Sequence, residues 1–393
     1  MEEEIMFKVN DNYQKLPGSY LFSTIAKKVS AFSQANPDKN IIRLGIGDVT
    51  QPIAPAIIDA MHKAVDEMGD AATFHGYAPD LGYEFLRSAI AKNDYQARGC
   101  DISTDEIFVS DGAKSDSGNI QEIFSVDNRI AVCDPVYPVY VDSNVMAGRT
   151  GTYDKATETW SDVIYMPCTA ANNFVPEFPK ETPDIIYLCL PNNPTGTYVN
   201  SAKVEEFIRK LPDHVIPVVD EAYFEYVEDP THYSLIKMIQ EGYDRPLFVL
   251  RTFSKIYGMA GLRIGYTFAD PLLIDELMKA CQAWNVSYNA LAAAQAALKD
   301  QEYIKKIKAL TTAGRKYLED ELTKLGCTLA KPCANFIYFD THHDPKEIRA
   351  ALAEQKIMIS AFGFNRVSVG TEEQNKAFIA ALKEILAAYY FFK

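Results

Sequence analysis

The segment Thr252–Arg263 contains the residues best suited to chemistry. Its lysine, Lys255, lies between small hydroxyl residues and a glycine-containing turn. A lysine that forms a Schiff base needs open access and a lowered pKa, which partial burial and a neighbouring cation provide. The hydroxyls of Thr252 and Ser254 and the rigid fork of Arg263 are donors that suit a phosphate group. The segment therefore predicts a reactive lysine beside a phosphate site, although a lysine in a turn beside an ordinary ion pair is the simpler alternative.

Two further segments offer groups that suit an aromatic nitrogen heterocycle. Asp220 follows a predicted buried strand, and a carboxylate there can pair with a protonated pyridine nitrogen, so that the ring withdraws electrons. Asn193 and Tyr223 could hold a phenolic oxygen on the same ring. Viewed alone, an aspartate that ends a strand is more often a helix cap or a turn residue, and Asn193 could be only a turn residue.

A second set of phosphate donors is predicted at Ser110–Lys114, which follows a strand-like run and opens a helix. Backbone amides at a helix N-terminus bind phosphate, although many such helix starts bind nothing. Tyr137 could stack on a planar ring, although a tyrosine in the core is the commoner role. A reactive lysine, phosphate donors and ring-binding groups together are what pyridoxal 5′-phosphate requires.

These residues follow a series of predicted buried strands. Short apolar runs alternate with helical patterns, which is typical of an α/β protein. The runs cover residues 129–133, 185–190, 215–219 and 247–250, and polar or glycine-containing residues come after each. Ligands of open α/β sheets bind beyond the carboxyl ends of the strands, so these four strand ends predict one shared cleft.

The C-terminal part of the chain predicts a smaller α/β domain. A helical, charged stretch at 300–325 precedes a strand at 335–339, a helix at 345–355, a strand at 366–369 and a helix from about 372. We therefore expect an N-terminal arm and part of the small domain over residues 1–45. A large cofactor-binding domain is expected over 46–283, and the C-terminal small domain over 284–393.

The bulk composition argues against several classes of protein. The 393 residues carry a net charge of -14, which argues against general binding to nucleic acid or to an anionic membrane. The seven cysteines form no CxxC pair, which favours a reducing compartment. The acidic N-terminus is unlike a signal or transit peptide, and no apolar run reaches membrane-spanning length. We expect a cytoplasmic protein that acts on small molecules and uses no metal.

Across essentially its whole length the sequence resembles the fold-type I, pyridoxal-phosphate-dependent aminotransferases of class I and II. From residue 16 to about 196 it is similar to LL-diaminopimelate aminotransferases, in Arg43–Pro52, Lys92–Tyr95, Ser110–Asp116 and Asp134–Tyr140. From about 220 onward it is closer to histidinol-phosphate aminotransferases, in Val219–Tyr223, Leu250–Gly258, Trp284–Ser287 and Val367–Thr371. The resemblance implies an α/β fold with a mostly parallel, seven-stranded sheet in the large domain, and a chain that is a hybrid of two subfamilies.

The resemblance implies a role for each residue of the cofactor site. Lys255 would form the Schiff base and move protons, Asp220 would pair with the pyridine nitrogen, and Tyr137 would stack on the ring. These three are the predicted catalytic residues. Cofactor binding would also involve a residue from the second subunit of a homodimer, Tyr77, and seven residues of the same subunit: Ala113, Lys114, Asn193, Tyr223, Thr252, Ser254 and Arg263.

For the substrate, the resemblance implies that Arg366 grips the α-carboxylate and that Asp80 faces a distal ammonium group. The complete predicted set is Tyr20, Gly47, Asp80, Lys114, Tyr137, Asn193, Asn285 and Arg366. The implied reaction transfers an amino group between glutamate/2-oxoglutarate and LL-diaminopimelate/tetrahydrodipicolinate, in lysine biosynthesis. Ala78, where the family usually has glycine, and the loop 360–365 depart from the family pattern.

An aminotransferase of histidinol phosphate or of an aromatic amino acid is the first alternative. Histidinol-phosphate enzymes commonly carry an extra arginine near the end of the preceding strand, whereas Ile357–Ser360 contains no cation. A phosphate substrate would then lose a charge-assisted contact of about 1.5–3 kcal/mol. The second alternative is a non-enzymatic regulator that kept the fold, and the intact set of cofactor residues argues against it.

Overall fold

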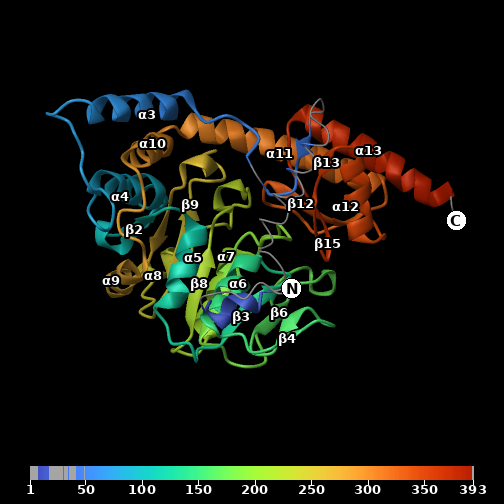
Figure 1. The fold of residues 1–393 in the computed structure, drawn as a ribbon, viewed down its shortest axis with the longest axis horizontal. Coiled ribbons are helices and arrows are strands. Elements are labelled where there is room, and N and C mark those ends of the chain that lie inside the picture. The colour runs from blue at the N-terminus through green and yellow to red at the C-terminus, as the bar shows by residue number, and fades with distance from the viewer. Residues whose placement is uncertain (1–7, 17–29, 31–33, 35–40, 48, 392–393) are drawn as a thin grey trace.

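The computed structural model describes residues 8–16, 30, 34, 41–47 and 49–391. A larger α/β unit and a smaller one are linked by the long helix α11 (Gln301–Lys324), which runs along one side of the molecule (Figure 1). No helix among these residues is long and apolar enough to cross a membrane. Tyr20, a predicted substrate residue, lies outside the described residues, as does most of the predicted arm 1–45.

The larger unit is built on a seven-stranded sheet with the strand order β2-β10-β9-β8-β7-β3-β6. β10 is antiparallel to β2 and β9, whereas each neighbouring pair from β9 to β6 is parallel. The strands are β2 (Ile107–Ser110), β10 (Gly265–Phe268), β9 (Phe248–Thr252), β8 (Ile216–Asp220), β7 (Ile185–Cys189), β3 (Ile130–Asp134) and β6 (Ile164–Pro167). This arrangement confirms the predicted α/β class and the mostly parallel sheet.

Helices follow most of these strands, and local sequence signals fix where several begin. α6 has Pro138 in its first turn, where proline needs no hydrogen-bonding N–H, and α9 combines Pro271 with a side-chain cap from Asp270. The helices of the larger unit are α3 (Pro55–Met68), α4 (Glu84–Ile90), α5 (Ala113–Glu122), α6 (Pro138–Ala147), α7 (Ser201–Lys210), α8 (Lys237–Gln240), α9 (Pro271–Ala280) and α10 (Tyr288–Lys299). The short helix α1 (Asp11–Gln14) and the hairpin of β4 (Tyr153–Asp154) and β5 (Thr159–Trp160) complete it.

The smaller unit has a four-stranded antiparallel sheet in the order β11-β12-β15-β14. Its elements are β11 (Thr328–Leu329), β12 (Phe336–Asp340), β14 (Ser360–Phe362), β15 (Phe364–Ser368), α12 (Pro345–Glu354) and α13 (Glu372–Phe391). A second parallel pair joins β1 (Ile42–Arg43) to β13 (Ile357–Met358), and the Leu44 carbonyl accepts a hydrogen bond from the Ser368 amide. The segment 42–47 therefore runs beside the smaller unit and leads toward the larger one.

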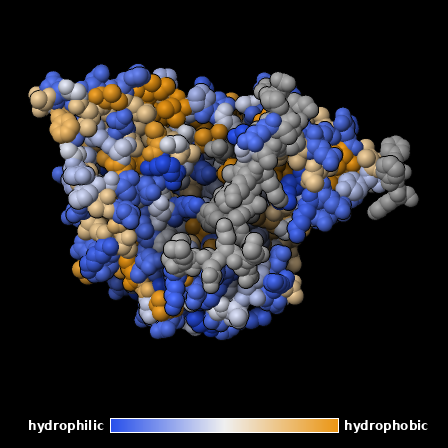
Figure 2. Space-filling model, in the orientation of Figure 1, coloured by the Kyte–Doolittle hydropathy of each residue, from blue (hydrophilic) through white to orange (hydrophobic). Residues whose placement is uncertain are grey.

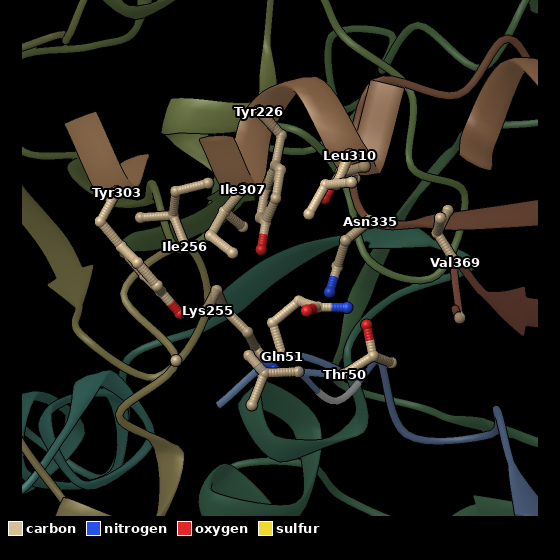
Figure 3. Close-up of a pocket in the computed structure, with 14 residues that line it drawn as sticks. Thr50, Gln51, Tyr226, Lys255, Ile256, Tyr303, Ile307, Leu310, Asn335 and Val369 are labelled. Carbon is tan, nitrogen blue, oxygen red and sulfur yellow. The ribbon is translucent and has the colours of Figure 1, made fainter. Parts of the chain in front are cut away.

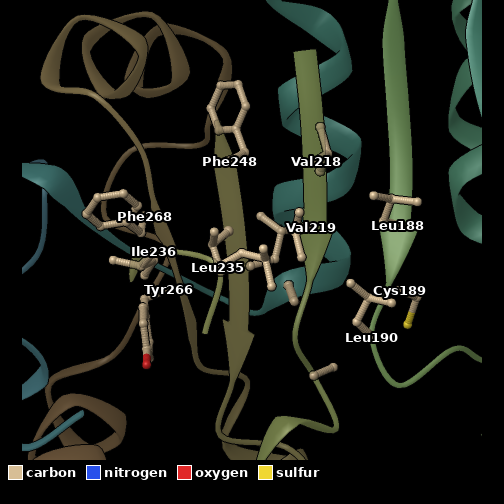
Figure 4. Packing of buried hydrophobic residues seen from close by; sticks show 14 of the residues in the cluster. Leu188, Cys189, Leu190, Val218, Val219, Leu235, Ile236, Phe248, Tyr266 and Phe268 are labelled. Carbon is tan, nitrogen blue, oxygen red and sulfur yellow. The ribbon is translucent and has the colours of Figure 1, made fainter. Parts of the chain in front are cut away.

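Two main hydrophobic clusters hold the structure together. In the larger cluster, Leu188, Val218, Val219 and Phe248 from three neighbouring strands pack side by side (Figure 4). The sequences of these strands are continuous apolar runs, because both faces of a parallel sheet are covered. In the smaller cluster, Leu44 belongs with buried hydrophobic residues that lie between Leu318 and Leu386 in the sequence. The predicted domain division at 283/284 stays a prediction. Buried residues of α10, which follows this division, and Ile307 of α11 belong to the larger cluster.

One end of the larger unit carries apolar side chains that face solvent. Ile58, Val65 and Met68 of α3 are exposed, and so are Phe74 and Tyr77 in the loop that follows. Hydrophobic residues gather over α3 in the surface view (Figure 2). An apolar surface of this kind suits contact with another protein chain.

Candidate active site

A cavity lies where the larger and smaller units meet, at the carboxyl ends of β7, β8 and β9. It comprises about 1080 Å³ of space, part of it open to solvent. The predicted residues that line it are Ala113, Lys114, Tyr137, Asn193, Asp220, Tyr223, Thr252, Ser254, Lys255, Arg263 and Arg366. The strand ends therefore converge on one cleft, as the sequence predicts.

Lys255 reaches this cavity from the turn that follows β9. Its Nζ donates a hydrogen bond to the Gly47 carbonyl (3.1 Å) and lies 5.5 Å from the centre of the Tyr223 ring. Lys255 also lines a second, smaller pocket, where Figure 3 shows it near Gln51 and Tyr226. The amine is half-buried and can be approached from the main cavity, which a nucleophile requires.

Asp220 ends β8 at the base of the cavity and is 6% exposed. Burial raises the pKa of its carboxyl group, and three interactions oppose that rise. The Tyr140 hydroxyl donates a hydrogen bond (2.6 Å), the Ala222 amide donates another (2.9 Å), and the charge of Lys255 is close. Sequence reasoning missed Tyr140, which lies in the first turn of α6 three residues after Tyr137, the residue that precedes the helix; the centres of the two rings are 5.5 Å apart.

Cationic and helix-terminal groups line another part of the cavity. Arg263 donates to the carbonyls of Asp111 (3.0 Å) and Ala260 (3.1 Å), which holds its guanidinium beside the first turn of α5. A Cβ atom at Gly112 would lie 2.9 Å from Arg263 Nη2, and Gly112 has φ +127°, so glycine is required there. Burial lowers the pKa of Lys114, and the nearby Arg263 lowers it further. Donors and cations of this kind are suited to binding an anion.

Hydroxyl groups of the β9 turn complete this part of the cavity. The Ser254 amide donates to the Thr252 hydroxyl at 3.0 Å, which fixes the turn between Thr252 and Lys255. The lining of the cavity thus combines a buried carboxylate, an amine, and a group of donors suited to an anion. This set of groups fits a phosphorylated pyridine aldehyde.

Arg366 of β15 reaches the cavity from the smaller unit and is 4% exposed. Its guanidinium donates to Asn193 Oδ1 (2.5 Å) and to the Gly45 carbonyl (2.7 Å), and its central carbon lies 5.0 Å from the centres of the Phe336 and Phe362 rings. Asn193 in turn donates to the Tyr223 hydroxyl (3.4 Å). An aromatic sandwich of this kind orients an arginine for bidentate carboxylate binding.

The remaining predicted residues lie away from the cavity lining. Tyr77 is 81% exposed and stacks on Trp284, with ring centres 4.5 Å apart. Asp80 lines a separate surface pocket, and Asn285 donates to Asp111 Oδ1 at 3.3 Å. Gly47 contacts Lys255 through its carbonyl. Within one chain, the predicted cofactor residues other than Tyr77 all line the cavity, whereas Asp80 and Asn285 do not.

Three comparisons place the chain among known proteins. The family described as aminotransferase class I and II matches residues 39–382. An LL-diaminopimelate aminotransferase of Agathobacter rectalis is 67% identical over 264 residues, which is 67% of this chain and 65% of that relative. The matched part therefore spans less than two thirds of the relative's length. It is longer than the segment 16–196 on which the predicted resemblance rested.

Solved structures agree on the fold. The LL-diaminopimelate aminotransferase of Chlamydomonas reinhardtii has a TM-score of 0.86 at 30% identity and covers 98% of this chain and 100% of its own. A histidinol-phosphate aminotransferase of Sinorhizobium meliloti, in complex with pyridoxal 5′-phosphate, has a TM-score of 0.78 at 22% identity and covers 98% and 99%. The predicted fold-type I architecture is confirmed, and the second likeness concerns the fold alone.

Asp116, in the first turn of α5, is a buried carboxyl group to which the sequence assigned no role. It is 0% exposed, and its Oδ2 accepts a hydrogen bond from the Ser110 hydroxyl (2.7 Å). Burial raises the pKa of Asp116 to about 7, against the effect of that hydrogen bond. The folded protein thus favours the protonated form. Its contribution to stability is complete below the unfolded-state pKa near 4 and is lost as the pH rises to about 7.

We predict that Asp116→Asn removes this pH dependence, because the amide stays neutral and can still accept from Ser110. Urea unfolding of the protein without added cofactor gives the free energy of unfolding of the variant and of wild type. The value for the variant minus the value for wild type should increase by about 3 kcal/mol from pH 5 to pH 8. Asp213→Asn, whose side chain is 96% exposed in the wild type, is the control and should follow the wild type at both values. A relative stability of Asp116→Asn that does not change with pH would contradict the assignment.

Proposed function

Because the chain belongs to the family of class I and II aminotransferases, we propose that it transfers amino groups with pyridoxal 5′-phosphate as cofactor and LL-diaminopimelate as a substrate. The observation that carries the proposal is that Lys255, Asp220 and Arg366 line one cavity. The relatives named LL-diaminopimelate aminotransferase support the choice of substrate.

The residues present suit the cofactor at each of its polar groups. Arg263, the hydroxyls of the β9 turn and the start of α5 would hold the phosphate. Asp220 would pair with the ring nitrogen, and its hydrogen bond from Tyr140 would keep the carboxylate in place. Tyr223 and Asn193 would hold the phenolic oxygen, and Tyr137 the ring face. When bound, the cofactor withdraws electrons from the Cα–H bond of the amino acid attached to it.

The chain's own groups then have defined tasks. Arg366 would bind the substrate α-carboxylate, for which its contacts with Asn193 and Gly45 already orient the guanidinium. Lys255, once its amine is neutral, would take the proton from the substrate Cα and deliver it to the C4′ carbon of the cofactor, and it would move a proton the opposite way in the second half-reaction. Burial lowers the pKa of Arg366, but a guanidinium remains charged in proteins. Two half-reactions with different amino acids would use the same site in turn.

A homodimer with composite active sites would bring the remaining residues into use. Tyr77 and Trp284 form an exposed stacked pair, and the exposed face of α3 lies in the same part of the larger unit. In a dimer, Tyr77 would reach the phosphate of the partner's site, while Asp80 and Asn285 would contact substrate there. Tyr20 would also contact substrate. We propose that the enzyme is cytoplasmic and serves lysine biosynthesis.

The cavity gives little support to a phosphate-ester substrate. The cations among its lining residues are Lys114, Lys255, Arg263 and Arg366, and the proposed cofactor and α-carboxylate use them. The segment Ile357–Ser360, which covers β13 and the start of β14 and where histidinol-phosphate enzymes commonly have an additional arginine, contains no cation. A distal phosphate would therefore lack a charged partner in this part of the site.

We predict that Lys255→Ala lowers kcat by about 100- to 10,000-fold, because the proton-transferring amine is lost. The visible absorbance of the lysine-bound cofactor should disappear as well. Lys305→Ala, which removes a 72% exposed side chain on α11, is the matched control and should retain both signals. Wild-type turnover by Lys255→Ala would refute the catalytic role. A wild-type protein that stays colourless with added cofactor would instead favour a non-enzymatic role.

The substrate proposal predicts a clear order of amino donors. With 2-oxoglutarate as acceptor, kcat/KM for LL-diaminopimelate should exceed that for histidinol phosphate by about 10- to 100-fold, the loss expected for one missing charge-assisted hydrogen bond. Steady-state assays of the purified holoenzyme with each donor measure this ratio. A higher kcat/KM for histidinol phosphate or for an aromatic amino acid would move the chain to the alternative substrate class.

A further inference from the structure

A cluster of buried charges lies next to the active site, and the proposed mechanism does not use it. We call it the Arg251 cluster, after the arginine at its centre. The Arg251 side chain, 2% exposed, donates to both carboxylate oxygens of Asp94 (3.1 Å each), to Glu221 Oε2 (3.1 Å) and to Glu225 Oε1 (2.8 Å). Arg98 pairs with Asp94 as well. The three carboxylate groups are 1–7% exposed.

A change of helix geometry brings Asp94 to this cluster. The helix α4 continues as a π-helical turn, Ala91–Tyr95, in which the Gln96 amide donates to the Ala91 carbonyl five residues back. Within this turn Asp94 and Tyr95 are buried, and Asp94 also accepts from the Tyr266 hydroxyl of β10. A π-helical turn within an α-helix is rare and is frequently found at functional sites. Here it places a carboxylate against Arg251.

The composition of the cluster is unusual for a purely structural contact. It holds three carboxylates and two guanidinium groups, so negative charge is in excess. Burial raises the pKa of Glu221 and of Glu225, and Arg251 opposes the rise in both. The Phe224 ring lies 4.2 Å from the Arg251 guanidinium carbon and 4.9 Å from that of Arg98. Packed apolar side chains often stabilise a fold as well as buried ion pairs do, so packing alone does not explain the cluster.

The position of the cluster along the chain points to its task. Glu221 directly follows Asp220 at the end of β8, and Arg251 directly precedes Thr252 at the end of β9. The two strands are paired there, with the Glu221 amide donating to the Leu250 carbonyl (2.9 Å). Because side chains alternate along a strand, Arg251 and Thr252 point to opposite faces of the sheet. The cluster therefore fastens the two strand ends from the face away from the cavity.

Glu221 is held from a second direction. Its carboxylate accepts from the Ser234 hydroxyl (2.8 Å) and from the Leu235 amide (2.9 Å). Arg251 is thus joined through Glu221 to the segment before α8, and through Asp94 to the segment after α4. The two Nη atoms of Arg251 contact different carboxylates, Nη1 that of Glu221 and Nη2 that of Asp94, so the planar guanidinium fixes their relative placement, which a lysine at the same position would not do.

We propose that Arg251 is a positioning residue, which through Asp94 and Glu221 sets the relative placement of Asp220 and Lys255. The inference rests on the proposed function, in which these two residues act on opposite sides of one cofactor. A displacement of about 1 Å between reacting groups can lower a rate by about 100-fold. A clamp at the strand ends is an effective way to prevent such a displacement.

The test compares the holoenzyme of Arg251→Lys with wild type. Arg251→Lys keeps the positive charge but loses the fork, so we expect kcat to fall by about 10- to 100-fold with little change in KM. The visible circular dichroism of the bound cofactor, which reports how the ring is held, should change as well. Asp94→Asn should give the same pattern, and it lowers the excess negative charge while keeping the side-chain size, so it tests the proposal even if Arg251→Lys folds poorly.

The control is Arg149→Lys, because Arg149 is another buried arginine with several hydrogen bonds, to the carbonyls of Gln121 (2.6 Å), Phe124 (2.6 Å) and Ser125 (3.0 Å). It should lose stability but keep the wild-type kcat and cofactor spectrum. A folded Arg251→Lys or Asp94→Asn holoenzyme with wild-type kcat and circular dichroism would overturn the positioning role. If wild-type protein binds no cofactor, the proposed function fails instead, so the two failures are distinguishable.

Discussion

The parallel pairing of β8 with β9 is the constraint on which the site depends. In this register Asp220 lies beside Leu250, so the chain leaves β8 at a carboxylate and leaves β9 just before the turn that carries Lys255. Parallel strands end at the same edge of a sheet, and a ligand placed there meets both groups. β7 adds Asn193 from the turn beyond its end, and the N-terminus of α5 adds Ala113 and Lys114 to the lining. The reactive groups are distant in sequence and adjacent because of the sheet.

The site carries local positive charge, although the protein as a whole is negatively charged. The chain is acidic, with a net charge of -14, yet the cavity lining contains four cationic side chains. An anionic ligand would therefore be bound by these placed groups rather than by the field of the whole molecule. Asp220, in the cavity lining, and Asp116, in the first turn of α5, are buried carboxyl groups, and burial raises the pKa of each. For Asp220 the hydrogen bonds from Tyr140 and Ala222 and the charge of Lys255 counter that effect.

Much of the fold and of the cofactor cavity was predictable because the signals are local. Apolar runs mark β3, β7, β8 and β9, and the polar residues that follow them mark the cleft. The antiparallel β10 between β2 and β9 had no such signal, since strand order depends on pairing between distant segments. The contacts of Tyr140 and Arg251 were missed for the same reason: their partners lie far away in sequence.

The predicted substrate residues form a different case. Tyr77, Asp80 and Asn285 received roles only through resemblance, and those roles require a second subunit, so no pattern within one chain could place them in a site. Asp116 shows a further limit. Its position at the start of a helix can be predicted from the sequence. Its complete burial cannot, because the burial depends on the packing of α5 against β9 and β10.

The most direct test of the account is to find which atom of the protein carries the cofactor. Holoenzyme prepared with pyridoxal 5′-phosphate would be reduced with borohydride, digested, and mapped by mass spectrometry. The account predicts one modified residue, Lys255, at close to one cofactor per chain. Modification at Lys114 or scattered over surface lysines, with Lys255 unmodified, would contradict it.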